Sequence, residues 1–90
     1  MKQQVVVVTG ASAGLGRAIA CAFAQRGAAV GLIARGGDCI EGLEGAKRDV
    51  EERGGKALIL PCDVADPAQV DAAAEKAEAE LGPIVVWVNN

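Results

Sequence analysis

Apolar residues change their spacing several times along this chain, and the changes predict alternating strands and helices. Val5–Thr9 is a continuous run of β-branched residues, which is typical of a strand buried on both faces of a sheet. From Leu15 to Phe23 the apolar positions recur at helical spacing, and Gly27 is a natural end for that helix. Ala28–Ala34 is apolar throughout, so we expect a second strand there.

A second helix is predicted to begin at a capping box formed by Asp38 and Glu41. It should end at the glycine pair that begins with Gly54. Gly42 and Gly45 lie inside it and weaken it by about 1 kcal/mol each relative to alanine. Its inner face is expected to carry three apolar residues, namely Ile40, Leu43 and Val50.

A third strand is expected at Ala57–Leu60, followed by a third helix. Asp66 is placed to cap that helix, with Pro67 at its first position and Gln69 where a capping-box partner belongs. A Gly-Pro pair ends the helix, and Ile84–Val88 then reads as a fourth strand.

The resulting order is β-α-β-α-β-α-β, which predicts an α/β fold with a parallel, doubly wound sheet of the Rossmann type. Right-handed crossovers give the strand order 3-2-1-4. They also place the first two helices on one face of the sheet and the third on the other. With 90 residues, 51% of them hydrophobic, the chain is expected to form one small domain or part of one.

Composition excludes several classes of function. The net charge of −3 argues against nucleic acid or an anionic membrane as the main partner, because both select basic surfaces. The chain has no histidine, and none of its three cysteines stands in a C-x-x-C pair, so we expect no metal site. No apolar run approaches the ~18 residues of a membrane span, and the prediction is a soluble, cytoplasmic protein.

Three glycines mark the turn between the first strand and the first helix. In a doubly wound sheet this turn holds the phosphates of a nucleotide, because helix N-terminal amides and the helix dipole favour an anion there. Gly10 would allow the tight turn, Gly14 the approach of backbone to phosphate, and Gly16 the close packing of helix on sheet. The alternative is a glycine-rich turn that binds nothing. No Gly-Lys-Ser/Thr ending follows, which disfavours a P-loop.

The segment Thr9–Gly16 reads T-G-A-S-A-G-L-G, which resembles the T-G-x-x-x-G-x-G signature of short-chain dehydrogenases/reductases. Two further matches follow in the family's order. Cys62–Val64 is similar to the Asp-Val pair after the third strand, and Trp87–Asn90 to the start of the N-N-A-G motif after the fourth. The resemblance implies cofactor contacts from the turn residues Gly10, Ser12, Ala13, Gly14, Leu15 and Gly16.

Arg35 follows the second strand, about twenty residues after the glycine turn. An acidic residue at this place binds the ribose hydroxyls of NAD, whereas an arginine suits the 2′-phosphate of NADP. We therefore expect NADP(H) to be preferred, with NAD(H) still possible. The alternative for Arg35 is a solvated loop charge.

The resemblance also implies roles for three residues after the third and fourth strands. Asp63 would accept from the adenine amine, Val64 would pack on the adenine ring, and Asn89 would lie near the cofactor ribose. A simple turn residue is the rival interpretation of Asp63. Thr9 is expected to tie the first strand to the fourth.

In this family the catalytic serine and the Tyr-x-x-x-Lys pair follow the N-N-A-G motif. The resemblance therefore implies that residues 1–90 are the N-terminal part of one NAD(P)-binding Rossmann domain, and we expect no catalytic residue within them. The whole enzyme would transfer hydride between NADP(H) and a small carbonyl or alcohol substrate, as a homo-oligomer. The rival class is a nucleotide-binding module without catalysis. A methyltransferase also uses a glycine-rich first turn, but the Arg35 and Asn89 positions do not favour it.

Overall fold

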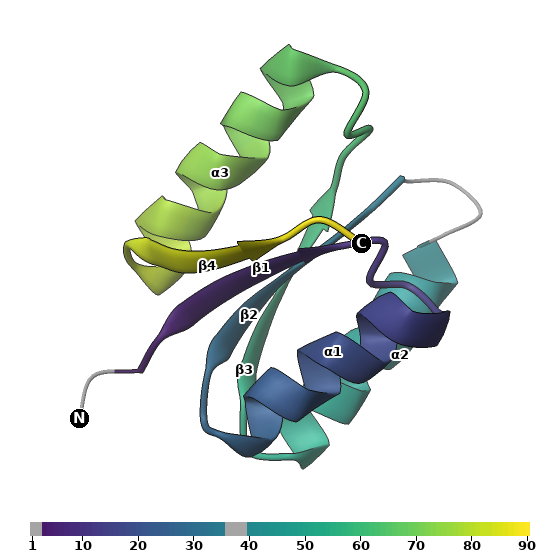
Figure 1. The fold of residues 1–90 in the computed structure, drawn as a ribbon, viewed down its shortest axis with the longest axis vertical. Coiled ribbons are helices and arrows are strands. Elements are labelled where there is room, and N and C mark those ends of the chain that lie inside the picture. Colours follow the sequence, from purple (N-terminus) through teal and green to yellow (C-terminus); the bar gives the residue numbers. More distant parts are fainter. Residues whose placement is uncertain (1–2, 36–39) are drawn as a thin grey trace.

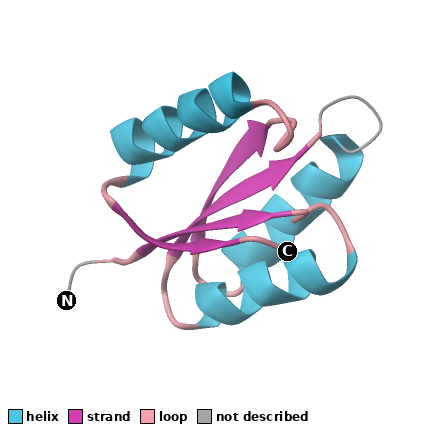
Figure 2. Ribbon diagram, turned by 45° about the horizontal axis from the view of Figure 1, so that its top comes forward, coloured by secondary structure: helices cyan, strands magenta, loops and turns pink. Residues whose placement is uncertain are grey.

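The computed structural model describes residues 3–35 and 40–90 and shows the predicted alternation (Figures 1 and 2). The elements are β1 (Val5–Thr9), α1 (Gly14–Gln25), β2 (Ala29–Ala34), α2 (Ile40–Glu52), β3 (Lys56–Pro61), α3 (Pro67–Leu81) and β4 (Ile84–Val88). The second strand begins one residue later than predicted, and the third is one residue longer at each end. The predicted cap at Asp38 lies outside the described residues.

All four strands are parallel and stand in the order β3-β2-β1-β4, so the predicted Rossmann-type topology is confirmed. Helices α1 and α2 cover one face of the sheet and α3 covers the other (Figure 1). This arrangement follows from right-handed crossovers, which change face when the chain reverses direction at β1.

Strand β1 lies at the centre of the sheet, and all five of its residues are buried. Successive side chains point to opposite faces. Val6 and Val8 pack towards α1 and α2, while Val7 packs with Ile33 towards α3. The continuous apolar run therefore supplies both halves of the core.

Helix α1 meets the sheet through small residues. Its buried positions are Gly16, Ala20 and Ala24, which recur every four residues. Leu15 is 69% exposed, and the larger apolar residues of the helix, Ile19 and Phe23, are only partly buried. The apolar pattern predicted where the helix lies in the sequence. The face of the helix that packs against the sheet is formed by glycine and alanine, which have little or no side chain.

Helix α3 begins as predicted at Asp66, whose carboxylate accepts a hydrogen bond from the Ala68 N–H at 3.0 Å. Gln69 has a different partner from the one expected in a capping box. Its side-chain oxygen accepts from the Asp63 N–H at 2.8 Å, and its amide donates to Asp66 at 3.1 Å. Gln69 therefore joins the end of β3 to the start of α3.

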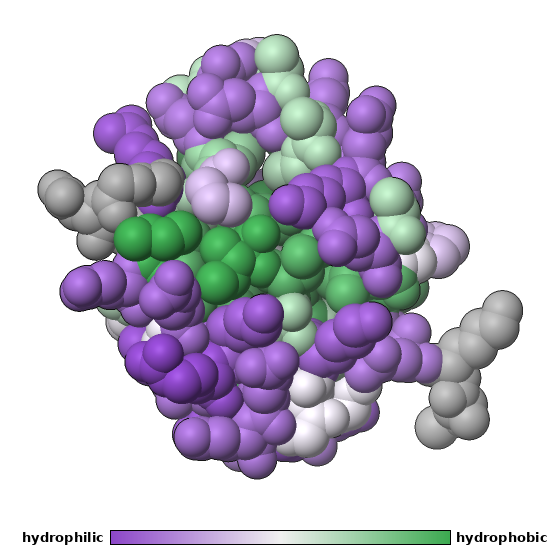
Figure 3. All heavy atoms as spheres, turned by 180° about the vertical axis from the view of Figure 1, so that it is seen from behind, coloured by the Kyte–Doolittle hydropathy of each residue, from purple (hydrophilic) through white to green (hydrophobic). Residues whose placement is uncertain are grey.

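Strand β3 forms one edge of the sheet, on the side of the molecule seen in Figure 3. Apolar side chains form a band there between more polar regions of the surface. Within residues 3–35 and 40–90, no helix combines the length and the apolar character needed to cross a membrane.

Candidate functional site

The carboxyl ends of the parallel strands meet at one edge of the sheet and surround a groove of about 310 Å³. The groove is lined by residues from four segments that lie far apart in sequence. Five of the predicted cofactor residues are among them, namely Gly10, Ser12, Arg35, Asp63 and Val64. The remaining five, Ala13, Gly14, Leu15, Gly16 and Asn89, lie outside the groove lining.

The turn after β1 needs glycine at two positions for its backbone conformation. Gly10 has a φ of +61° and Gly14 a φ of +58°, in the left-handed region that residues with a side chain rarely adopt. Between them the Ala11 N–H donates to the Ile33 carbonyl at 3.0 Å, which anchors the turn to β2. Glycine is therefore favoured at both positions by the backbone conformation of the turn alone.

Gly16 is required for a different reason. A Cβ at Gly16 would overlap the carbonyl oxygen of Gly10 and would lie 2.7 Å from Nδ2 of Asn90. The first turn of α1 therefore touches the end of β1 directly. This close contact is the one that the sequence pattern predicts for the third glycine.

The space in front of α1 is open. A Cβ at Gly14 would meet no atom within 4 Å. The N-cap, Ala13, provides no side-chain hydrogen bond, and the first turn carries no acidic residue. In α3, by contrast, the Asp66 carboxylate accepts a hydrogen bond from the Ala68 N–H. The first-turn amides of α1 are thus left for an external anion, which the positive end of the helix dipole also attracts.

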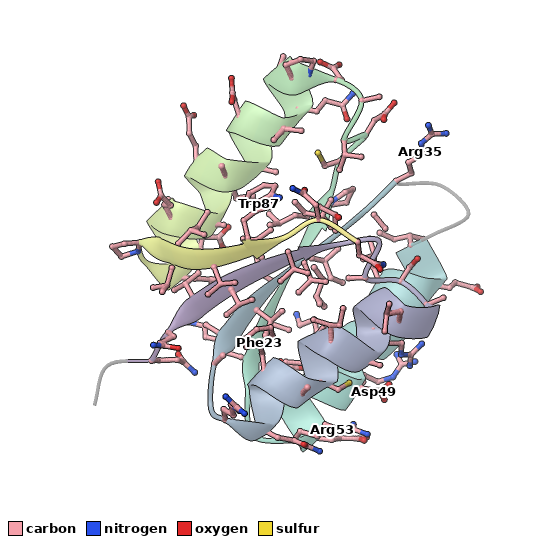
Figure 4. All side chains as sticks on the ribbon, in the orientation of Figure 1. Phe23, Arg35, Asp49, Arg53 and Trp87 are labelled. Carbon is pink, nitrogen blue, oxygen red and sulfur yellow. The ribbon has the colours of Figure 1, made fainter. Side chains whose placement is uncertain are left out.

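Arg35 and Asp63 face each other across the groove. The Arg35 guanidinium nitrogen lies 3.8 Å from Oδ1 of Asp63, with side chains 75% and 39% exposed. Figure 4 shows the Arg35 side chain projecting beyond the carboxyl end of β2. Asp63 Oδ1 also accepts from the Ala65 N–H at 2.9 Å, so Asp63 has the turn role that was its rival interpretation. An exposed pair at this distance contributes little stability and leaves the guanidinium accessible to a ligand.

Thr9, at the end of β1, and Asn90, two residues after β4, lie side by side in the groove lining. The Thr9 hydroxyl donates to the Val88 carbonyl at 3.4 Å and accepts from the Asn90 N–H at 2.9 Å, so it ties β1 to β4 as predicted. Asn90 lines the groove, and its Nδ2 lies 3.5 Å from the Gly10 carbonyl oxygen.

Asn89 points elsewhere: its side-chain oxygen accepts from Nε1 of Trp87 at 2.9 Å. Trp87 itself packs on the α3 side of the sheet. Neighbouring residues of an extended segment point to opposite sides, so only one of the two asparagines can face the groove. The sequence analysis assigned a cofactor contact to Asn89 and none to Asn90, because the Asn-Asn pair alone does not reveal which member faces the groove.

Cys62 also lines the groove. Its side chain is buried, and this burial raises the pKa of the thiol, as do the negative charges of Asp63 and Asp66. The thiolate is the reactive form of cysteine, so burial and the raised pKa both disfavour a nucleophilic role for Cys62. Its side chain is a small apolar part of the groove lining.

Comparison with known proteins defines the family. The family model described as short chain dehydrogenase matches residues 4–90, and the chain belongs to this family of oxidoreductases. Fatty acyl-CoA reductase of Acinetobacter baylyi is 38% identical over 90 residues, which are 100% of this chain and 30% of that protein. General stress protein 39 of Bacillus subtilis is 36% identical over 100% of this chain and 31% of its own length.

Solved structures show the same fold. L-Sorbose reductase from Gluconobacter frateurii, in complex with NADPH and L-sorbose, has a TM-score of 0.88 at 38% identity, covering 100% of this chain and 34% of that one. A blue fluorescent protein from a metagenomic library, in complex with NADPH, has a TM-score of 0.91 at 36% identity, covering 99% and 36%. The chain thus spans about a third of the length of the proteins it resembles.

Proposed function

We propose that residues 1–90 form the cofactor-binding part of an oxidoreductase that transfers hydride between NADP(H) and a small carbonyl or alcohol substrate. The observation that carries the proposal is one groove that joins two features. Ser12 lines the groove and leads directly into the α1 N-terminus, which has no side-chain cap. The accessible guanidinium of Arg35 belongs to the same groove. These two features suit the pyrophosphate and the 2′-phosphate of one NADP(H) molecule.

Each part of the cofactor has chemically suitable partners. The pyrophosphate would bind at the first-turn amides of α1, where the open space at Gly14 admits it. The adenosine half would occupy the groove, with Val64 against the ring, Asp63 near the exocyclic amine and Ser12 beside the 2′-phosphate. The ribose contact of Asn89 stays a prediction from family resemblance, and the position of Asn90 makes it a second candidate.

The bound cofactor would supply the hydride chemistry, and these residues would bind and orient it. We assign no catalytic acid or base within 1–90. Catalysis, substrate choice and homo-oligomeric assembly in the whole protein are part of the proposal. Its support is the family match and the NADPH named for two structural neighbours.

The test is a comparison of NADPH and NADH affinities in the intact protein and in Arg35→Asp. Loss of a charge-assisted contact of ~1.5–3 kcal/mol should weaken NADPH binding by about one to two decades, while NADH affinity stays equal or rises. Arg48→Glu is the matched control, because Arg48 is exposed on α2 outside the groove and the change in net charge is the same. Equal affinities for both cofactors in wild type and Arg35→Asp alike would contradict the assignment.

A further inference from the structure

Two glycines inside α2, Gly42 and Gly45, lie against the glycine turn and α1. A Cβ at Gly42 would lie 2.7 Å from the carbonyl oxygen of Ser12 and 2.9 Å from its Cβ. Real side chains essentially never come so close to a backbone oxygen. The absence of a side chain at Gly42 is therefore what lets the turn after β1 rest directly on α2.

Gly45, one helical turn later, meets a different kind of neighbour. A Cβ there would lie 2.9 Å and 3.1 Å from the guanidinium nitrogens of Arg17. That guanidinium binds Asp49 of α2, with nitrogen–oxygen distances of 2.7 Å and 2.8 Å, in the region where Figure 4 labels Asp49. The end of an arginine side chain can shift by a few tenths of an ångström through its rotatable bonds, whereas the Ser12 backbone cannot.

The Ser12 carbonyl cannot move away freely because the turn is held on its other sides. The Ala11 N–H is bonded to the Ile33 carbonyl of β2. The Gly10 carbonyl is in contact with the first turn of α1 at Gly16. A methyl group on α2 would therefore displace the turn as a unit, and with it the first-turn amides of α1.

We propose that Gly42 is a positioning residue, which sets the place of the phosphate-binding turn by admitting the Ser12 backbone against α2. The inference rests on the proposed function, since it concerns how the pyrophosphate of NADP(H) is held. It gives a reason for a glycine whose helix propensity alone is unfavourable.

The test compares Gly42→Ala with Gly45→Ala in the intact protein. Both changes introduce the same methyl group into the same helix and raise its helix propensity equally. The ligands are NADPH, which carries the pyrophosphate, and adenosine 2′-monophosphate, which lacks it. We expect Gly42→Ala to weaken NADPH binding about tenfold or more, since sub-ångström misplacement of binding groups has large effects. Because Ser12 is itself proposed to lie beside the 2′-phosphate, the binding of adenosine 2′-monophosphate should weaken too, but by less than that of NADPH. Gly45→Ala should bind both ligands within twofold of wild type.

The outcomes separate this inference from the proposed function. If wild type binds neither NADPH nor NADH, the proposed function fails and the role of Gly42 fails with it. If wild type binds NADPH and Gly42→Ala binds it equally well, only the role of Gly42 is overturned. The role of Gly42 would also be overturned if Gly42→Ala lost the same factor in affinity for both ligands, or if it did not fold. Gly42 would then support the fold in general.

Discussion

Replacing Gly14 by alanine distinguishes two effects of a side chain at this position, namely strain in the backbone and loss of cofactor binding. Gly14 has a φ of +58° and Gly27 a φ of +81°. A Cβ at either position would meet no atom within 4 Å. Alanine should therefore cause backbone strain alone at both sites, at about 1 kcal/mol. The two variants should therefore be destabilised to the same small extent and have similar melting temperatures.

Only one of the two glycines faces the proposed phosphates. Gly27 lies between α1 and β2, at the amino end of that strand, whereas Gly14 opens α1 at the carboxyl end of β1. A methyl at Gly14 would occupy the space proposed for the pyrophosphate and hold it away from the amides. Losing two charge-assisted hydrogen bonds of ~1.5–3 kcal/mol each amounts to at least about 100-fold in affinity.

The assay is titration of the intact protein and both variants with NADPH, by calorimetry or nicotinamide fluorescence, beside thermal unfolding. Gly14→Ala should lose at least about 100-fold in affinity, and Gly27→Ala should bind within twofold of wild type. Wild-type affinity in Gly14→Ala would show that the phosphates bind elsewhere. Equal weakening in both variants would assign the effect to stability.

Three further results are expected. Gly16→Ala should destabilise the fold by about 1–3 kcal/mol in urea unfolding, because its methyl would overlap the Gly10 carbonyl; a neutral or stabilising effect would contradict that contact. The free energy of unfolding should fall as pH rises above 9.0, because folded Cys62 has a raised pKa and keeps its proton after the unfolded chain has lost it. Cys62→Ala should remove that part of the slope, and an unchanged slope would refute the linkage. A polypeptide of residues 1–90 should associate in size-exclusion chromatography with light scattering, because β4 pairs only with β1 among the described strands and Ile84–Val88 carries no charge. A monodisperse monomer would show that the unpaired edge of β4 does not cause association.

Within the described residues, the spacing of apolar residues and the turn residues between them located the strands and helices to within a residue or two. The predicted start of the second helix at Asp38 lies outside those residues. The run Val5–Thr9 and the later apolar runs predict strands because a parallel sheet buries both faces of a strand. The order 3-2-1-4 then follows from the handedness of crossovers. The sequence also predicted the glycine turn, because its three glycines lie close together in one short segment between the first strand and the first helix.

Contacts between distant segments were decided only by the tertiary structure. Sequence alone does not show that Asn90, rather than Asn89, faces the turn, since the choice depends on how β4 leaves the sheet. It also counts Gly42 only as a weak helix position, whereas the packing of α2 on the turn makes it a point of backbone contact. The physical reason is that periodicity reports which side of an element is apolar. It does not report how closely two elements approach, and that distance decides where a side chain can exist at all.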